Sequence, residues 1–173
     1  MIKKINDYRL NKLIFLSLFF YICFFTLNIQ AQKKAQIFNP KANAKKDINE
    51  AVAIAKKQNK NVLLQIGGNW CPWCLKLHNF VNNDKVIDSL LNANYVFIVV
   101  NYSKENKNKE VLEELEFPQR FGFPVLVILN NDGKRIHTQN SAYLEEGKTY
   151  NRKKIIDFLN NWSVKALDPK TYL

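Results

Sequence analysis

Residues 61–74 read NVLLQIGGNWCPWC, and this stretch decides the fold. The apolar run within residues 61–66 has the length and composition of a buried strand. The Gly-Gly-Asn sequence at 67–69 then breaks that strand. A helix can start from Cys71, because Pro72 would fall in its first turn, where a missing N–H costs nothing. The stretch therefore predicts a strand, a bend and a helix, with a Cys-x-x-Cys pair at the start of the helix.

The two cysteines suit thiol chemistry. A thiolate is the attacking species, and an ordinary cysteine, with a pKa of about 8.5, is mostly protonated at neutral pH. The unpaired N–H groups and the dipole of a helix N-terminus favour the anion, so we expect Cys71 to be the exposed, activated sulfur. Cys74, one turn deeper, would resolve a mixed disulfide formed on Cys71. The alternative is an inert small disulfide or two ordinary buried cysteines.

The segments on both sides of this stretch alternate between strands and helices. Asp47 and Glu50 have the spacing of a capping box, which predicts a helix start at Asp47. The run YVFIVV at residues 95–100 is β-branched and aromatic throughout, and we predict that it is a central strand. The alternation predicts an α/β fold, with a central mixed β-sheet flanked by helices and an extra N-terminal helix. The other predicted elements are short helices over 86–91 and 110–116, a strand over 125–129, an edge strand near 134–139 and a final helix over 152–162.

The N-terminus has the order of a secretory signal. A basic lead precedes the uncharged run LIFLSLFFYICFFTL at residues 13–27, and the small Ala31 suits the last position before cleavage. We therefore predict a signal peptide over residues 1–31. One alternative is an uncleaved membrane anchor over residues 13–32, because about 20 apolar residues can cross a bilayer. Another is a lipid attached to Cys23. All three place the rest of the chain outside the cytoplasm, in a periplasmic or other extracytoplasmic location.

The remainder of the chain has a usual length for one domain. Residues 32–46 lack apolar periodicity and contain a proline, so they are interpreted as a linker. Residues 47–165 are the predicted domain, and residues 166–173 are a predicted C-terminal tail.

The chain is basic, with a formal net charge of +11, but its charge pattern does not indicate a nucleic-acid partner. Lysines are scattered in pairs such as Lys45-Lys46 instead of forming one basic arm. If Cys23 leaves with a signal peptide, Cys71 and Cys74 are the remaining cysteines. A loop this short constrains little unfolded-chain entropy, which favours a reactive pair over a structural staple. An exported protein would also meet an oxidising compartment.

Residues 45–163 resemble the thioredoxin superfamily, and within it the thioredoxin-7-like group. The resemblance rests on Trp-Cys-x-x-Cys at 70–74 and on the sequence LHNFVNNDKVIDSLLNANYVFIVVNYS that follows it. It implies a thioredoxin fold and a cis-proline opposite the redox pair, and Gly122-Phe123-Pro124 before the strand VLVIL matches that element. It also implies that Phe123 and Pro124 bind the substrate backbone.

Two departures from the thioredoxin pattern concern the chemistry of the pair. Thioredoxins place a buried acid six residues before the first motif cysteine, where this chain has Gln65. An uncharged amide cannot act as a base, so water or another acid would deprotonate Cys74, or that step would be slower. The dipeptide Pro72-Trp73 replaces Gly-Pro, which leaves the direction of electron flow open within the spread of about 150 mV for such pairs.

The combined prediction is a thiol–disulfide oxidoreductase of exported proteins, with Cys71 and Cys74 as catalytic residues and no cofactor. Its partners would be protein thiols or disulfides and a second dithiol protein. The substrate-binding residues would be Trp70, Trp73, Phe123 and Pro124. One alternative is a metal chaperone that uses Cys71, Cys74 and His78, because thiolates and imidazole suit zinc or copper. Another is a thioredoxin-fold interaction module without catalysis.

Overall fold

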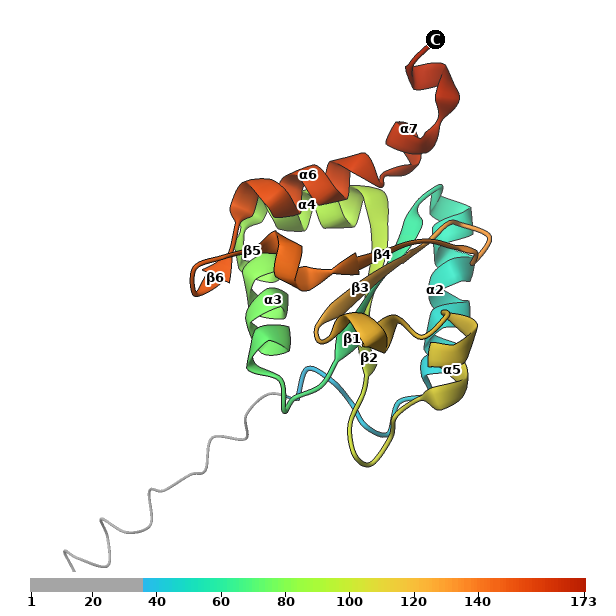
Figure 1. The fold of residues 1–173 in the computed structure, drawn as a ribbon. Helices are drawn as coiled ribbons and strands as arrows, with labels where there is room; N and C mark the ends of the chain where they lie inside the picture. Colours follow the sequence, from blue (N-terminus) through green and yellow to red (C-terminus); the bar gives the residue numbers. More distant parts are fainter. Residues whose placement is uncertain (1–35) are drawn as a thin grey trace, which may run out of the picture. The chain divides into compact units, whose positions relative to one another are not determined.

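A four-stranded sheet forms the centre of the computed structural model, which describes residues 36–173 (Figure 1). The strands lie in the order β2-β1-β3-β4. β1 pairs parallel with β2 and antiparallel with β3, and β4 pairs antiparallel with β3. The predicted mixed sheet and the predicted edge position of the last strand are both confirmed. The strands are β1 (Asn61–Gly67), β2 (Tyr95–Asn101), β3 (Val125–Leu129) and β4 (Arg135–Asn140).

Helices cover both faces of the sheet. One layer contains α2 (Ala44–Gln58) and α5 (Lys109–Glu114), and the other contains α3 (Pro72–Asn83), α4 (Lys85–Asn94) and α6 (Arg152–Asn161). Side chains of β1 alternate between the layers, because successive residues of a strand point to opposite faces. Leu64 thus packs with α2 and α5, whereas Leu63 packs with α3, α4 and α6. The predicted α/β architecture, with a helix before the first strand, is confirmed.

β2 is an edge strand, and the prediction of a central strand is wrong. It pairs with β1 on one side and has no strand of the described residues on the other. Its sequence is apolar because α2 and α4 both pack against it. An apolar composition therefore indicates that both faces of this strand are covered, but it does not indicate whether the strand is central or at the edge.

α2 begins at Ala44, about one turn before the predicted start. The Asn43 side chain caps the helix by accepting a hydrogen bond from the Lys46 N–H at 3.0 Å. Asp47 lies inside the first turn, so the prediction that it begins the helix is wrong. An asparagine cap is as effective as an aspartate cap, so the helix can begin at the earlier of the two residues.

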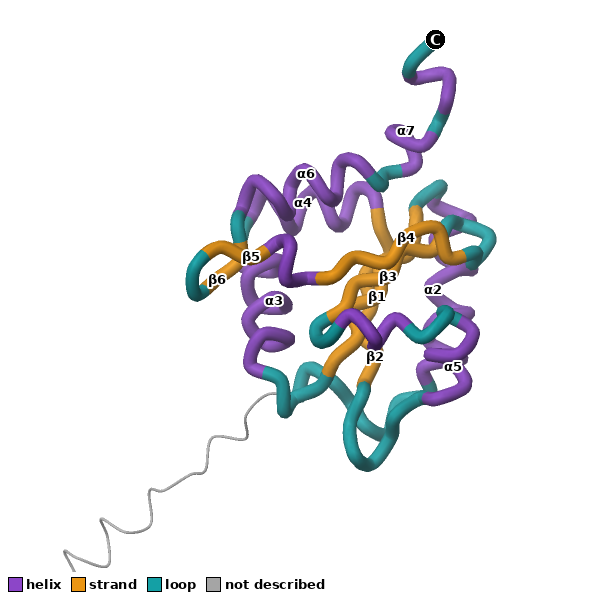
Figure 2. The backbone as a smooth tube through the Cα atoms, in the orientation of Figure 1, coloured by secondary structure: helices purple, strands orange, loops and turns teal. Residues whose placement is uncertain are grey.

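Residues 36–43 form neither a helix nor a strand (Figure 2), yet they belong to the same compact unit as the rest of the domain. Phe38 in this segment is fully buried. The predicted linker over 32–46 is therefore wrong from residue 36 onward. The predicted signal peptide over 1–31 and tether over 13–32 lie outside the described residues. Within residues 36–173, no helix is long and apolar enough to cross a membrane.

Several short elements complete the domain after β2. A small hairpin of β5 and β6 was not predicted, and α7 crosses the predicted start of the C-terminal tail at residue 166. In Figure 1, α7 leads the chain beyond the end of α6. The short elements are η1 (Pro118–Phe121), η2 (Ser141–Leu144), β5 (Glu145–Glu146), β6 (Thr149–Tyr150), α7 (Val164–Leu167) and η3 (Pro169–Thr171).

Candidate redox site

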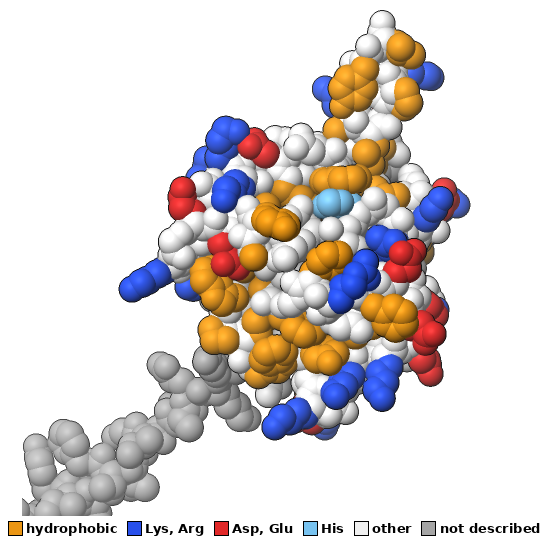
Figure 3. All heavy atoms as spheres, viewed as in Figure 1, with side chains coloured by type: hydrophobic (Ala, Val, Ile, Leu, Met, Phe, Trp, Pro, Cys, Tyr) orange, Lys and Arg blue, Asp and Glu red, His pale blue; other side chains and the backbone are white. Residues whose placement is uncertain are grey.

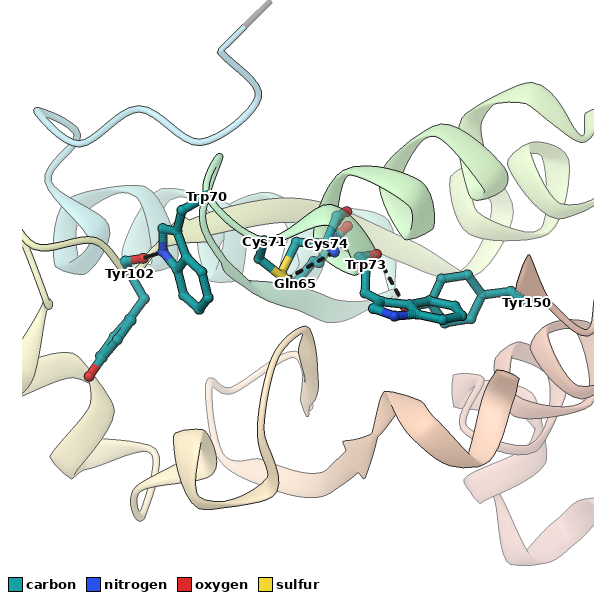
Figure 4. Close-up of a disulfide and its surroundings, with 7 residues drawn as sticks. All are labelled: Gln65, Trp70, Cys71, Trp73, Cys74, Tyr102 and Tyr150. Carbon is teal, nitrogen blue, oxygen red and sulfur yellow. Dashed lines mark hydrogen bonds between the residues drawn. A yellow bond between two sulfur atoms is a disulfide. The ribbon is translucent and has the colours of Figure 1, made fainter. Parts of the chain in front are cut away.

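Cys71 and Cys74 lie between the end of β1 and the first turn of α3, and their sulfurs form a disulfide (Figure 4). Their Cα atoms are 5.2 Å apart. Cys71 is the N-cap residue of α3, and Pro72 occupies the first turn. The predicted strand, bend and helix, with the pair at the start of the helix, are confirmed.

The helix N-terminus is directed at the Cys71 sulfur. The Cys74 N–H donates a hydrogen bond to Cys71 Sγ at 3.1 Å. Once the disulfide is reduced, this N–H and the α3 dipole would stabilise negative charge on that sulfur. The arrangement therefore favours Cys71 as the thiolate of the pair.

Both cysteines are buried. Cys71 is 4% exposed and Cys74 is 0% exposed, so the expectation of an exposed Cys71 sulfur is wrong for the disulfide form. Phe38 is the third buried residue of the cluster that they form, and Trp73 and Phe123 are among the half-buried residues packed against it. These aromatic rings account for the burial, and of the three only Phe38 was not predicted to lie at the site.

The two glycines before the pair allow a close approach of the main chain. A Cβ at Gly67 would lie 2.5 Å from Cys74 Sγ, and one at Gly68 would lie 2.6 Å from the carbonyl oxygen of Tyr102. The Gly67 carbonyl in turn accepts a hydrogen bond from the Tyr102 N–H at 2.5 Å. Only glycine leaves room for these contacts, so the bend is also the point where β1 passes the Cys74 sulfur.

Gln65 lies below the pair, fully buried (Figure 4). Its Nε2 donates a hydrogen bond to the Cys74 carbonyl at 2.8 Å. Its Oε1 is buried without a hydrogen-bond partner in the described part of the chain. No aspartate or glutamate among residues 36–173 is buried, so the described domain provides no internal carboxylate as a base for Cys74.

The Phe123–Pro124 peptide bond is cis, the isomer that the resemblance implies. Phe123 packs against the cluster that contains the two cysteines. Its ring makes an edge contact with Trp70, with centroids 5.5 Å apart, and lies 4.6 Å from the ring of Tyr102. The structure thus brings Phe123 and its cis bond together with Trp70 and the redox pair.

The two tryptophans lie on opposite sides of the disulfide and differ in their surroundings (Figure 4). Trp70 is 56% exposed, and its indole N–H donates to the Tyr102 carbonyl at 2.6 Å. Trp73 is half-buried and makes an edge contact with Tyr150, with centroids 5.4 Å apart. Lys76 Nζ lies 4.3 Å from the centre of the Trp73 ring. More than half of the Trp70 side chain is therefore exposed, whereas much of Trp73 packs within the domain.

Tyr150 also supports the main chain between the two cysteines. Its hydroxyl donates a hydrogen bond to the Trp73 carbonyl at 3.2 Å. Burial raises the pKa of this hydroxyl far above its ordinary value, so it remains a donor throughout the physiological range. The hairpin that carries Tyr150 is thus part of the site.

His78 is half-buried and lies against Phe97 of β2 instead of beside the cysteines. Its ring stacks on that of Phe97, with the two ring centroids 6.1 Å apart. Burial lowers the pKa of His78, and its Nδ1 is buried without a partner in the described domain. Within residues 36–173, no group of three His, Cys, Asp or Glu side chains is arranged to hold a metal ion. The structure gives no support to the alternative that combines Cys71, Cys74 and His78.

Sequence reasoning missed Phe38, Tyr102 and Tyr150 as residues of the site. Phe38 lies in an irregular segment and Tyr150 in a two-residue strand, so neither is part of a periodic pattern. Tyr102 immediately follows β2. Its position after a predicted strand was the one signal that could have placed it near the end of β1.

Hydrophobic side chains are exposed around the site. Figure 3 shows a group of them in the lower part of this face, over the start of α3 and around η1, with Lys and Arg side chains beside it. The exposed large residues of this region include Trp70, Phe117 and Phe121. An apolar surface of this kind next to a reactive group is typical of a site that receives another protein.

Comparisons with known proteins agree with this geometry. A family model described as thioredoxin-like matches residues 43–131, more than half of the chain. The search of curated proteins found no match to this chain. A disulphide isomerase from Xylella fastidiosa Temecula1 is similar in structure, with a TM-score of 0.63 and 24% identity over 71% of this chain and 93% of the other.

Two further solved structures are more distant. A thioredoxin from Thermus thermophilus has a TM-score of 0.49 and 21% identity over 75% of this chain and 88% of its own. The C-terminal domain of DsbD from Neisseria meningitidis, in the oxidised form, has a TM-score of 0.48 and 19% identity over 68% and 95%. The family match and the CxxC disulfide at the helix start lead to one conclusion: the chain belongs to the thioredoxin-like family and has the redox pair of a thiol–disulfide oxidoreductase.

Proposed function

We propose that this protein carries out thiol–disulfide exchange on exported proteins, with Cys71 as the nucleophile and Cys74 as the resolving cysteine. The observation that carries the proposal is the Cys71–Cys74 disulfide at the N-terminus of α3, where the Cys74 N–H donates to Cys71 Sγ. This hydrogen bond and the helix dipole both act on one of the two sulfurs. They give the two cysteines different roles.

In the reducing direction, the Cys71 thiolate attacks a substrate disulfide and forms a mixed disulfide, while one substrate sulfur leaves as a thiolate and takes up a proton. Cys74 then loses its proton and attacks Cys71 Sγ. The Cys71–Cys74 disulfide forms, and the second substrate sulfur leaves as a thiol. Two electrons have passed to the substrate, and a partner dithiol protein restores the pair by the same steps. Oxidation of a substrate is the reverse sequence.

Trp70, Trp73, Phe123 and Pro124 are the proposed substrate-binding residues, of which Pro124 is buried beside Phe123. Trp70 and Phe123 contact each other beside the pair, and the cis bond precedes Pro124. The exposure of Trp70 makes it the member with most area to offer. We assign Trp73 a smaller part, because its ring also packs on Tyr150.

We also propose that the protein acts outside the cytoplasm. The support is the basic lead followed by an uncharged apolar run at residues 13–27, which acts as a cleaved signal over 1–31 or as an anchor over 13–32. Cell fractionation combined with the mass of the mature protein tests this proposal. A mature form that begins near residue 32 would support cleavage, and a full-length form in the membrane fraction would support the anchor. A full-length cytoplasmic form would contradict the proposal.

Trapping of intermediates tests the exchange reaction. Cys74→Ser should accumulate mixed disulfides with other proteins, because no resolving thiol remains, and these complexes should dissolve on reduction. Cys71→Ser should accumulate few, and the double variant serves as the control. If Cys71→Ser trapped partners and Cys74→Ser did not, the two roles would be reversed. If neither did and the wild type exchanged no disulfides with a model protein, the proposed function would be wrong.

A further inference from the structure

The side chain of Phe38 packs against the redox pair. It is fully buried, and the other two buried members of its cluster are Cys71 and Cys74. A Cβ placed on Gly67 would lie 3.5 Å from Phe38 Cζ and 2.5 Å from Cys74 Sγ. The ring and the sulfur therefore meet the main chain of β1 at the same point, which places Phe38 next to the resolving cysteine.

Asn69 attaches Phe38 to the loop that carries the nucleophile. The Phe38 N–H donates to Asn69 Oδ1 at 3.1 Å, and Asn69 Nδ2 donates to the Phe38 carbonyl at 2.6 Å. Asn69 lies two residues before Cys71 in the chain. Residues 36–40 belong to no helix or strand. The two hydrogen bonds to Asn69 therefore hold the main chain of Phe38 in place, as the hydrogen bonds of a helix or sheet would elsewhere.

We propose that Phe38 is a positioning residue of the redox pair and that Asn69 latches it in place, so that the Cys74 sulfur is reached by Cys71 and not by solvent or foreign thiols. The inference rests on the proposed function, in which Cys74 must resolve the mixed disulfide on Cys71. A resolving thiol open to solvent would form a second mixed disulfide with a free thiol or be oxidised. A sealed one reacts within the molecule.

The seal also affects the equilibrium between the two redox forms. Reduction by glutathione breaks the Cys71–Cys74 bond, adds two electrons and two protons to the pair, and converts two glutathione molecules to glutathione disulfide. The product contains a polar thiol where the disulfide had none, and a dry environment disfavours polar groups. Opening the latch should therefore make the pair easier to reduce.

Two measurements on the full-length chain test the latch. The first is equilibration with glutathione buffers, in which Asn69→Ala and Phe38→Ala should shift the equilibrium constant towards the dithiol. A shift of about tenfold, or about 30 mV, is expected, because both variants would relieve part of the cost of burying a polar thiol in the reduced form. The second is alkylation of Cys74 in a Cys71→Ser background, with Cys74 distinguished from Cys23 by peptide mass. Labelling of Cys74 should accelerate by a similar factor.

Asn39→Ala provides the matched control. Asn39 is an exposed asparagine of the same segment, and its side chain accepts a hydrogen bond from the Lys41 N–H at 2.9 Å instead of contacting the site. It should leave both measurements unchanged. If Phe38→Ala does not fold, Asn69→Ala and Phe38→Leu decide the question.

Wild-type values for Asn69→Ala and Phe38→Leu in both measurements would overturn the inference. Neither measurement requires a protein substrate. A protein that traps no partners and exchanges no disulfides with a model protein, but whose variants show both shifts, would therefore refute the proposed function and support the latch. Normal trapping without the shifts would do the opposite.

Discussion

Gln65 occupies a buried position where an acid would assist the redox pair, and its amide instead donates to the Cys74 carbonyl. We expect Gln65→Glu to speed the resolution of mixed disulfides near pH 7. Burial raises the pKa of a carboxyl group, so the new side chain could exchange a proton in the neutral range and accelerate this step by up to about 100-fold. Single-turnover kinetics as a function of pH would measure the effect.

The same substitution should lower the free energy of unfolding by about 1–3 kcal/mol, because an ionised carboxylate cannot donate to the Cys74 carbonyl. Gln65→Leu is the matched control, since it removes the donor without adding an acid. It should be destabilised in the same way but show no gain in rate. Equal resolution rates for the Glu and Leu variants would show that proton removal from Cys74 does not limit the reaction.

Gly67 is the second residue at which a single change should disturb the pair. Gly67→Ala would place a methyl group 2.5 Å from Cys74 Sγ, and overpacking of this kind costs about 1–3 kcal/mol. Denaturant unfolding under reducing conditions should show this loss. Cys74→Ala in the same chain removes the sulfur that the methyl group meets, so the two changes together should cost less than their sum. Strict additivity would mean that the contact is relieved by movement elsewhere.

At the scale of the element, the first turn of α2 separates two candidate caps. Asn43 accepts from the Lys46 N–H, whereas Asp47 lies one turn further on. Asn43→Ala should therefore lower the free energy of unfolding by about 1 kcal/mol. Asp47→Ala should cost less, about 0.3–1 kcal/mol, because it removes only a favourable charge near the helix N-terminus. Equilibrium unfolding of both variants would compare them, and the reverse order would favour the start predicted from the sequence.

The β5–β6 hairpin supports the start of α3 through Tyr150. Tyr150→Phe removes the hydrogen bond to the Trp73 carbonyl and keeps the ring contact, so it should cost about 0.5–1.5 kcal/mol. Tyr150→Ala removes both and should cost about 3–5 kcal/mol. Unfolding in denaturant measures these losses. If the two variants were equally unstable, the ring contact with Trp73 would contribute nothing.

Several of these elements could be predicted from the sequence and others could not, for physical reasons. The strand, bend and helix at 61–74 have local signals: an apolar run, two glycines and a proline in the first turn. The position of β2 could not be predicted, because an apolar composition indicates only that both faces of a strand are covered. Which strands lie beside it depends on contacts between residues far apart in the sequence. Phe38 and Tyr150 reach the site through long-range packing from segments without a periodic pattern.

At the scale of the whole molecule, the site joins parts of the chain that are distant in sequence. Five segments meet around the first turn of α3: the lead-in at Phe38, the bend after β1, Tyr102 just after β2, the cis bond at Phe123 and the hairpin at Tyr150. Cooperative folding of the domain is therefore a condition for assembling the redox site. Changes in global stability and changes in redox chemistry must be measured separately for each variant.

Two half-buried histidines should make the stability of the whole domain depend on pH. Burial lowers the pKa of His78, and burial, followed by the charge of Arg135, lowers that of His137 despite a hydrogen bond with Gln139. Both titrate near pH 6.5 in the unfolded chain, so below that pH the unfolded state binds more protons than the folded state. The contribution of the neutral histidines to the free energy of unfolding should be complete above about pH 6.5. It should fall as the pH drops from there through the lower pKa values of the folded state. Urea unfolding at pH 7.5 and pH 5 would measure the fall, and His78→Gln and His137→Gln should each reduce it; an unchanged fall in both variants would assign it to other groups.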